Sequence, residues 1–287
     1  MHIEERFLAS KTGDPEDNED AIHASDSFVA VIDGATSKTL RLWQGRTSGQ
    51  LAAHVLIEAL GQLPKDATLQ QAIEHLSEAI RVVYTRDGML EMVASNPVER
   101  ITASLAVASV SRREVWLIGD CACIVGGRRI TNHKAIDRVL ADARSAYLES
   151  ELLGGKSIDD LRAHDTGREF IFPLLERQTL FQNTMSANPY AYAVLDGFPI
   201  PTRQIRICPI PPEPTSVVLA TDGYPVLHES LAASERALQR IIERDPLLMR
   251  QYKSTKGVQA GNISYDDRAF VRFSIVAAAA RDEEIGR

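Results

Sequence analysis

Cysteine, excess basic charge and long apolar runs are all scarce in this chain of 287 residues. The three cysteines form an odd set without a C-x-x-C spacing, which predicts reduced thiols and argues against a zinc site. A net charge of −7 argues against a general nucleic-acid binder, because such proteins present a basic face. No apolar stretch approaches the length of a membrane span, and the N-terminal residues lack the apolar core of a signal peptide. We therefore expect a cytoplasmic protein that binds neither nucleic acid nor membranes.

Several catalytic motifs are also missing. The chain contains no G-x-S-x-G elbow, which argues against a serine hydrolase of that type. Gly154-Gly155-Lys156-Ser157 matches the end of a phosphate-binding P-loop, but that motif requires glycine where Ser150 stands. The seven histidines have no metal-ligand spacing. The chemistry of this chain is therefore expected from its carboxylates.

Acidic residues lie at the ends of several strand-like segments. Asp33 closes the apolar run 28–32, and Asp222 closes the run 217–220. The full set is Glu19-Asp20, Asp33-Gly34, Asp120, Asp222-Gly223 and Asp266-Asp267. An Asp-Gly pair alone is a common turn dipeptide, so the signal lies in the combination. Strands that each end in a carboxylate can form an all-oxygen cage for Mg²⁺ or Mn²⁺, which predicts a metal-assisted hydrolase.

A predicted hairpin brings two of these clusters together. A two-residue turn at Asp26-Ser27 places Asp20 opposite Asp33 and Glu19 opposite Gly34. Like charges this close are destabilising unless a cation or a proton neutralises them. Glycine suits such a site, because without a Cβ its carbonyl can approach a cation.

The remaining patterns predict one α+β domain over residues 1–287, with two packed antiparallel sheets flanked by helices. Apolar residues at three- and four-residue steps predict helices at about 49–63, 69–84, 135–152 and 229–244. A second hairpin is predicted over 104–118, and further strands near 217–220 and 268–276. Residues 133–200 are polar and mixed in pattern, so they form either a variable flap or insertion over the site or an ordinary surface subdomain.

Six short blocks, taken in chain order, resemble the metal-dependent protein phosphatases of the 2C type. They are Asn18-Glu19-Asp20-Ala21, the segments 29–34, 102–107, 117–120 and 219–223, and Asp266-Asp267. These blocks extend over nearly the whole chain. The resemblance implies a four-layer α/β/β/α sandwich, two antiparallel sheets flanked by helix pairs, with a binuclear Mg²⁺ or Mn²⁺ centre at one end.

The resemblance also implies a role for each matching residue. Asp33 would bridge the two ions, Glu19 and the Gly34 carbonyl would bind one of them, and Asp222 and Asp266 would bind the other. The bridging hydroxide between the ions would then attack phosphorus.

Two more carboxylates complete the implied site. Asp20 would hold metal-bound water, and with Asp33 it forms the expected catalytic pair. Asp120, together with Asp222, would hold a third ion.

The sequence departs from the family pattern where the substrate phosphate is gripped. The arginine common five positions before the aspartate of N-E-D is replaced by Pro15. Ala35-Thr36-Ser37 follows Asp33-Gly34 and offers no general acid. We hypothesise that Lys11 or Lys38 supplies the missing positive charge.

The leading interpretation is a Mg²⁺- or Mn²⁺-dependent phosphoester hydrolase that acts on phosphoserine and phosphothreonine in a phosphorylated protein substrate. One alternative is a pseudophosphatase, a binding or regulatory module that lost efficient turnover with its arginine. Another keeps the chemistry but takes a small phosphorylated molecule. The intact carboxylate set favours the enzyme, because crowded acids are destabilising unless they hold metal.

Overall fold

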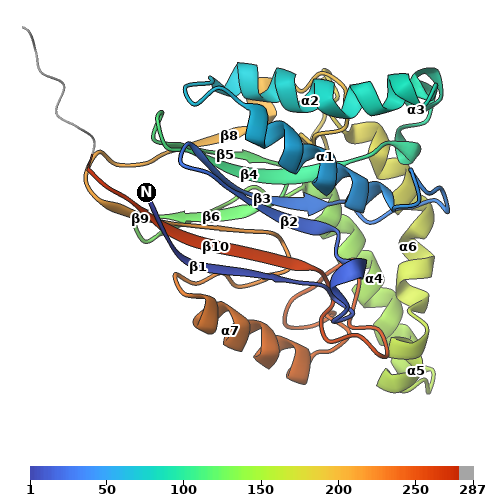
Figure 1. Ribbon diagram of the computed structural model, residues 1–287. Coiled ribbons are helices and arrows are strands. Elements are labelled where there is room, and N and C mark those ends of the chain that lie inside the picture. The colour runs from blue at the N-terminus through green and yellow to red at the C-terminus, as the bar shows by residue number, and fades with distance from the viewer. Residues whose placement is uncertain (278–287) are drawn as a thin grey trace, which may run out of the picture.

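Two antiparallel five-stranded sheets form the centre of the molecule in a computed structural model that describes residues 1–277 (Figure 1). The first sheet has the order β1 (His2–Ala9), β10 (Arg268–Ile275), β9 (Thr215–Ala220), β6 (Ala122–Val125) and β7 (Arg128–Thr131). The second has the order β2 (Asp20–Ala24), β3 (Phe28–Gly34), β4 (Ala103–Ser109), β5 (Glu114–Ile118) and β8 (Arg206–Pro209). The sheets pack face to face, and each outer face carries helices. The predicted α+β layered sandwich is confirmed.

Strand β3 shows why the sequence folds into layers. Its side chains alternate between two buried environments, as successive residues of a strand must. Val29 and Val31 pack between the two sheets. Ala30 and Ile32 pack toward the helices on the outer face. A strand buried on both faces reads as a continuous apolar run, which is what residues 28–32 are.

The helices α1 (Ser48–Gln62) and α2 (Leu69–Arg86) cover the outer face of the second sheet. Each begins at a threonine with a reciprocal capping box, Thr47 with Gln50 and Thr68 with Gln71, which satisfies backbone groups at the helix start. The short helix α3 (Leu90–Ser95) follows them. These helices agree with the apolar spacing predicted over 49–63 and 69–84.

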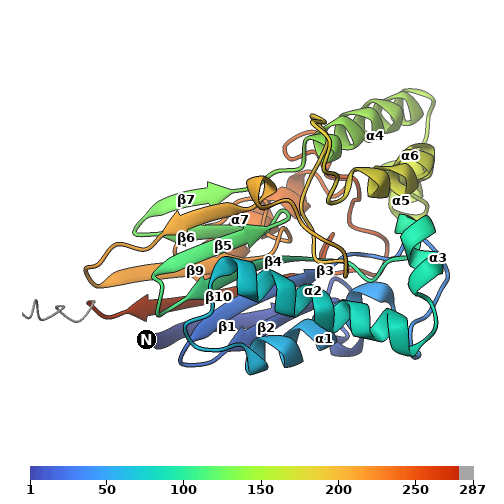
Figure 2. The same cartoon turned by 90° about the horizontal axis from the view of Figure 1, so that it is seen from above.

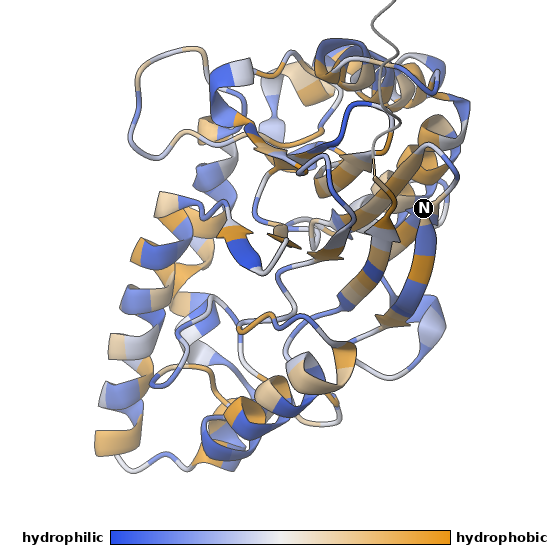
Figure 3. Cartoon of the chain, turned by 90° about the vertical axis from the view of Figure 1, so that its left-hand side faces the viewer, coloured by the Kyte–Doolittle hydropathy of each residue, from blue (hydrophilic) through white to orange (hydrophobic). Residues whose placement is uncertain are grey.

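The outer face of the first sheet is covered by α7 (Leu231–Arg244). Its buried residues Ser234, Leu238 and Ile241 are three and four positions apart, so one face of the helix meets the protein. Figure 3 shows this division as orange and blue bands along the helices. No helix among residues 1–277 is both long and apolar enough to cross a membrane.

A second helical group extends beyond the ends of the strands (Figures 1 and 2). It comprises α4 (Ala135–Leu153), α5 (Ile158–Ala163) and α6 (Thr166–Arg177), all within the predicted insertion at 133–200. The Arg144 side chain is fully buried there, and its guanidinium forms an ion pair with Asp165 at 2.7 Å. The same guanidinium donates hydrogen bonds to the carbonyls of Leu247 and Ser254. Arg144 thereby ties α4 and α6 to the loop before β10.

Candidate metal centre

The predicted carboxylates gather at one end of the two sheets. In the β2–β3 ladder Asp20 is paired with Asp33, as the hairpin register predicted. The Gly34 N–H donates to the Glu19 carbonyl at 3.1 Å, so the second predicted pairing is also present. The position of the two-residue turn alone was sufficient to predict this register.

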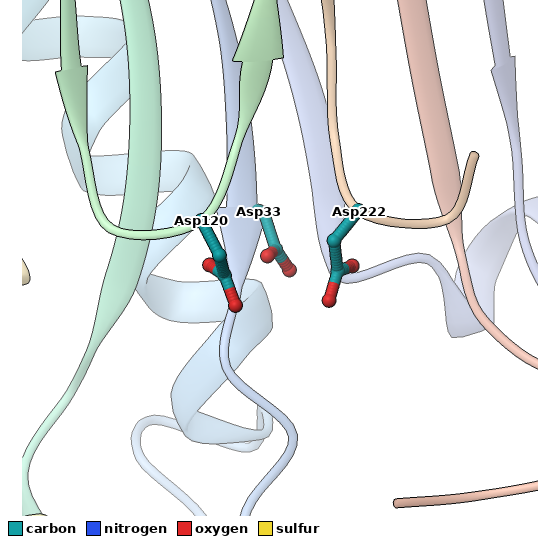
Figure 4. A group of neighbouring side chains, drawn as sticks. All are labelled: Asp33, Asp120 and Asp222. Atoms are coloured by element: carbon teal, nitrogen blue, oxygen red, sulfur yellow. The ribbon is translucent and has the colours of Figure 1, made fainter. Parts of the chain in front are cut away.

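Three carboxylates from different strand ends converge on one point. Asp33 is the next-to-last residue of β3, Asp120 lies between β5 and β6, and Asp222 follows β9. One oxygen from each lies within 4.8 Å of the others, and Figure 4 shows the three groups facing a common space. Asp266, which precedes β10, lines the same cavity. The donors are all oxygens, which is the ligand type that Mg²⁺ and Mn²⁺ prefer.

Glu19 and Gly34 are held by the start of α1. The Thr47 hydroxyl donates to a Glu19 carboxylate oxygen at 2.6 Å. Gly49 packs against Gly34 so closely that an added Cβ would lie 2.8 Å from the Gly34 carbonyl oxygen and 2.9 Å from Glu19 Oε1. A Cβ added at Gly34 would overlap the carbonyl oxygens of Gly49 and Glu19, so Gly34 is also required by backbone packing, beside any role of its carbonyl.

The two acidic residues before β10, Asp266 and Asp267, contact different groups. Asp267 accepts hydrogen bonds from the backbone N–H groups of Lys11 and Glu19, at 2.7 and 3.0 Å. Asp266 forms an ion pair with Lys256 at 2.5 Å. Asp267 thus fixes the polar loop beside Glu19, whereas Asp266 faces the cavity.

The protonation equilibria of the cluster fit a cation site. Burial, with repulsion from neighbouring carboxylates, raises the pKa values of Asp20, Asp33 and Asp222 well above the ordinary value. Asp20 Oδ2 is buried and has no hydrogen-bond partner among the described residues. Buried carboxylates with unmet acceptor capacity are stabilised by a divalent ion, so the residues present fit the metal that the resemblance implies.

Asp120 differs from the other acids because it already has cationic and hydroxyl partners. Lys134 Nζ lies 2.7 Å from one of its oxygens, and the Ser104 hydroxyl donates to the other at 2.6 Å. Although burial alone would raise the pKa of Asp120, Lys134 and Ser104 hold it below the ordinary value. An ammonium group therefore neutralises the position where a third ion was predicted.

A cavity of about 130 Å³ adjoins the carboxylates, and sequence reasoning missed several residues that line it. They are Lys134 and Asp137 near the start of α4, Arg168 in α6, and Lys256 in the loop before β10. Burial raises the pKa of Asp137 to about 6. These residues lie outside the motifs that marked the carboxylates, and tertiary packing brings them to the cavity, so no signal in the sequence marked them.

The two lysines predicted to bind phosphate occupy different positions. Lys38 lines the cavity. Lys11 is instead bound to Glu19 and Asp267, with Nζ–oxygen distances of 3.4 and 3.2 Å. Pro15 starts a short 3-10 helix, Pro15–Asp17, and is not among the residues that line the cavity.

Comparison with known families gives a match over most of the chain. The family described as protein phosphatase 2C matches residues 10–256. A comparison with curated proteins gives no match. The family assignment rests on the sequence match over 10–256.

Similar solved structures include three bacterial proteins. One is the serine/threonine phosphatase PstP/Ppp of Mycobacterium tuberculosis, with 17% identity, 97% of this chain and 100% of that chain covered, and a TM-score of 0.49. Another is PppA of Pseudomonas aeruginosa, described as a regulatory component of T6SS, with 12% identity, coverages of 96% and 98%, and a TM-score of 0.46. The third is the S. agalactiae serine/threonine phosphatase, with 11% identity, coverages of 96% and 100%, and a TM-score of 0.44.

Proposed function

Because this chain belongs to the protein phosphatase 2C family, we propose that it hydrolyses phosphoserine and phosphothreonine in protein substrates with two Mg²⁺ or Mn²⁺ ions. Asp33 is the proposed bridging ligand between the ions. Glu19 and the Gly34 carbonyl are proposed for one ion, and Asp222 and Asp266 for the other. When bound, the ions supply a water of lowered pKa and positive charge for the phosphate.

The chain's own residues orient this reaction. Asp20 is proposed to hold the attacking water, because its buried Oδ2 has an acceptor position that no described residue uses. Asp20 and Asp33 lie directly across the β2–β3 ladder, so the water and the bridging ligand would be placed by one rigid hairpin. Lys38 lines the cavity and is proposed to contact the phosphate.

The observation that carries this proposal is the convergence of Asp33, Asp120 and Asp222 to within 4.8 Å, although they come from three distant parts of the sequence. Charged groups crowded in this way are destabilising without a cation. A module that only binds a partner protein would have no need of them.

The test is hydrolysis of p-nitrophenyl phosphate with and without Mn²⁺. We expect metal-dependent turnover in the wild type and a loss of at least 100-fold in Asp33→Asn and Asp222→Asn. Asp142→Asn is the matched control, because Asp142 pairs with Lys253 on the surface and lies outside the cavity. Turnover that is absent despite metal binding by calorimetry would instead support a pseudophosphatase.

A second experiment distinguishes protein substrates from small phosphorylated molecules. We expect phosphopeptides to be hydrolysed with a higher kcat/KM than small phosphoesters of metabolite size. The reverse order would assign the enzyme to small phosphorylated molecules.

A further inference from the structure

Four cationic side chains line the cavity beside the metal centre, and they fall into two groups. Lys134 and Lys256 are bound to Asp120 and Asp266. Lys38 and Arg168 line the same cavity, and no carboxylate within residues 1–277 comes within 4 Å of either charged group. This second pair has charge to offer an incoming ligand.

Lys38 lies in the loop between β3 and α1. Its ammonium donates to the carbonyl of Thr36, in its own loop. Burial, followed by repulsion from Arg168 and Lys256, lowers the pKa of Lys38 to about 7. Glu19 acts on Lys38 only from beyond ion-pair distance, and its attraction does not offset these effects. No carboxylate among the described residues therefore forms an ion pair with Lys38.

Arg168 is far from Lys38 in the sequence and lies in the first turn of α6. Its Nη1 donates to the Thr255 carbonyl at 2.9 Å, which holds the guanidinium against the loop before β10. Burial lowers the pKa of Arg168 as well, although Asp165 and Asp266 oppose the shift from beyond 4 Å. Nearby Arg144, by contrast, is paired directly with Asp165. Arg168 is therefore positioned by a neutral backbone group and forms no ion pair with a carboxylate of residues 1–277.

Two half-buried cations that repel each other raise the free energy of the protein until an anion joins them. A guanidinium offers parallel N–H donors that match phosphate oxygens, and an ammonium adds a point charge. The carboxylates are the opposite case, because they require a cation. A phosphoryl group would supply the anion that Lys38 and Arg168 require, while the proposed metal ions would supply the cations that the carboxylates require.

We propose that Arg168 and Lys38 together bind the phosphoryl group of the substrate, and that Arg168 has the phosphate-binding role of the arginine that Pro15 replaces. The inference rests on the proposed function for the identity of the ligand. It assigns to the insertion at 133–200 a residue that touches the substrate.

The test measures binding of inorganic phosphate to the Mn²⁺-loaded protein by calorimetry. We expect Arg168→Met and Lys38→Met each to weaken phosphate binding about tenfold or more, with Mn²⁺ affinity unchanged. Arg168→Lys should retain part of the phosphate affinity, since lysine keeps the positive charge but lacks the parallel N–H donors of the guanidinium. Arg162→Met is the matched control, because Arg162 also donates to a backbone carbonyl, that of Val258, but does not line the cavity.

Unchanged phosphate affinity in both methionine variants would overturn the proposal. So would a raised KM for a phosphopeptide together with unchanged phosphate binding, because the pair would then contact the peptide instead. If Arg168→Met lowers the melting temperature, phosphate binding is measured in Arg168→Lys instead, because lysine retains the aliphatic part of the side chain and the positive charge. If the wild type binds phosphate through these residues but hydrolyses no phosphoester, the proposed function fails while this inference stands.

Discussion

Lys134 shows how a single residue alters the chemistry expected of a cluster. Asp120 belongs to a triangle of carboxylates, yet its nearest cationic partner is the ammonium of Lys134 at 2.7 Å. That ammonium also lies 5.2 Å from the centre of the Tyr192 ring, which limits its movement. A resident cation of this kind competes with any metal ion for the oxygens of Asp120.

We therefore predict that Lys134→Met adds a metal position. Removing the ammonium leaves Asp120 beside Asp33 and Asp222 without a counter-charge, so one more Mn²⁺ should bind per chain than in the wild type. Equilibrium dialysis against Mn²⁺ gives the number directly. Lys253→Met is the control, since Lys253 pairs with Asp142 on the surface. An equal number of bound ions in wild type and Lys134→Met would contradict the prediction.

At the scale of elements, the start of α1 and the end of β3 form one packed unit. Gly49 in the first turn of α1 lies against Gly34, and Thr47 binds the Glu19 carboxylate. The geometry of the proposed ligands Glu19 and Gly34 thus depends on how closely this helix approaches the strand.

Gly49→Ala should disturb that approach. Its Cβ would meet backbone and carboxylate oxygens at 2.8–2.9 Å, so we expect a loss of about 1–3 kcal/mol in the free energy of unfolding and weaker Mn²⁺ binding. Urea denaturation and calorimetry measure the two effects.

Gly61→Ala provides the control in the same helix, because the nearest atom to its Cβ would be 4.0 Å away, on His23. It should stabilise the protein by about 0.5–1 kcal/mol, since alanine favours helix. Equal effects of the two substitutions would show that close packing at Gly49 is unimportant.

Among the helices and strands, some features could be predicted from the sequence and others could not. Long helices and buried strands carry strong periodicity, and the β2–β3 register followed from one turn. The short strands β7 and β8 have four residues each and were not predicted, because so short a segment carries little pattern. Arg168 in α6 and Lys256 in the loop before β10 reach the site through tertiary packing, which local sequence does not encode.

For the whole molecule, the carboxylates couple metal binding to global stability. The pKa values of Asp20, Asp33 and Asp222 are raised in the folded state, so the fold retains protons that the unfolded chain has released. Stability contributed by these groups is therefore greatest at acid pH and declines as pH rises through the raised values.

We predict that the chelated protein loses stability from these groups as pH rises above the ordinary aspartate pKa of about 3.9 toward the raised values, and that Mn²⁺ reverses the loss. At 100 times its dissociation constant a single bound ion adds about 2.7 kcal/mol. Thermal unfolding with chelator and with Mn²⁺ measures both effects. Asp33→Asn should flatten the pH dependence of the chelated protein, since the amide does not titrate. Identical pH profiles for Asp33→Asn and wild type would refute this account.

The segment that contains α4–α6, anchored by Arg144, supplies the cavity with residues that do not belong to the two sheets. The proposed metal ligands lie at or near the ends of strands in the two packed sheets, whereas Arg168 and Lys134 belong to the segment 133–177 outside the sheets. Apart from Lys134, substitutions in this segment are therefore expected to alter substrate preference while the proposed metal ligands, which lie elsewhere in the chain, are retained.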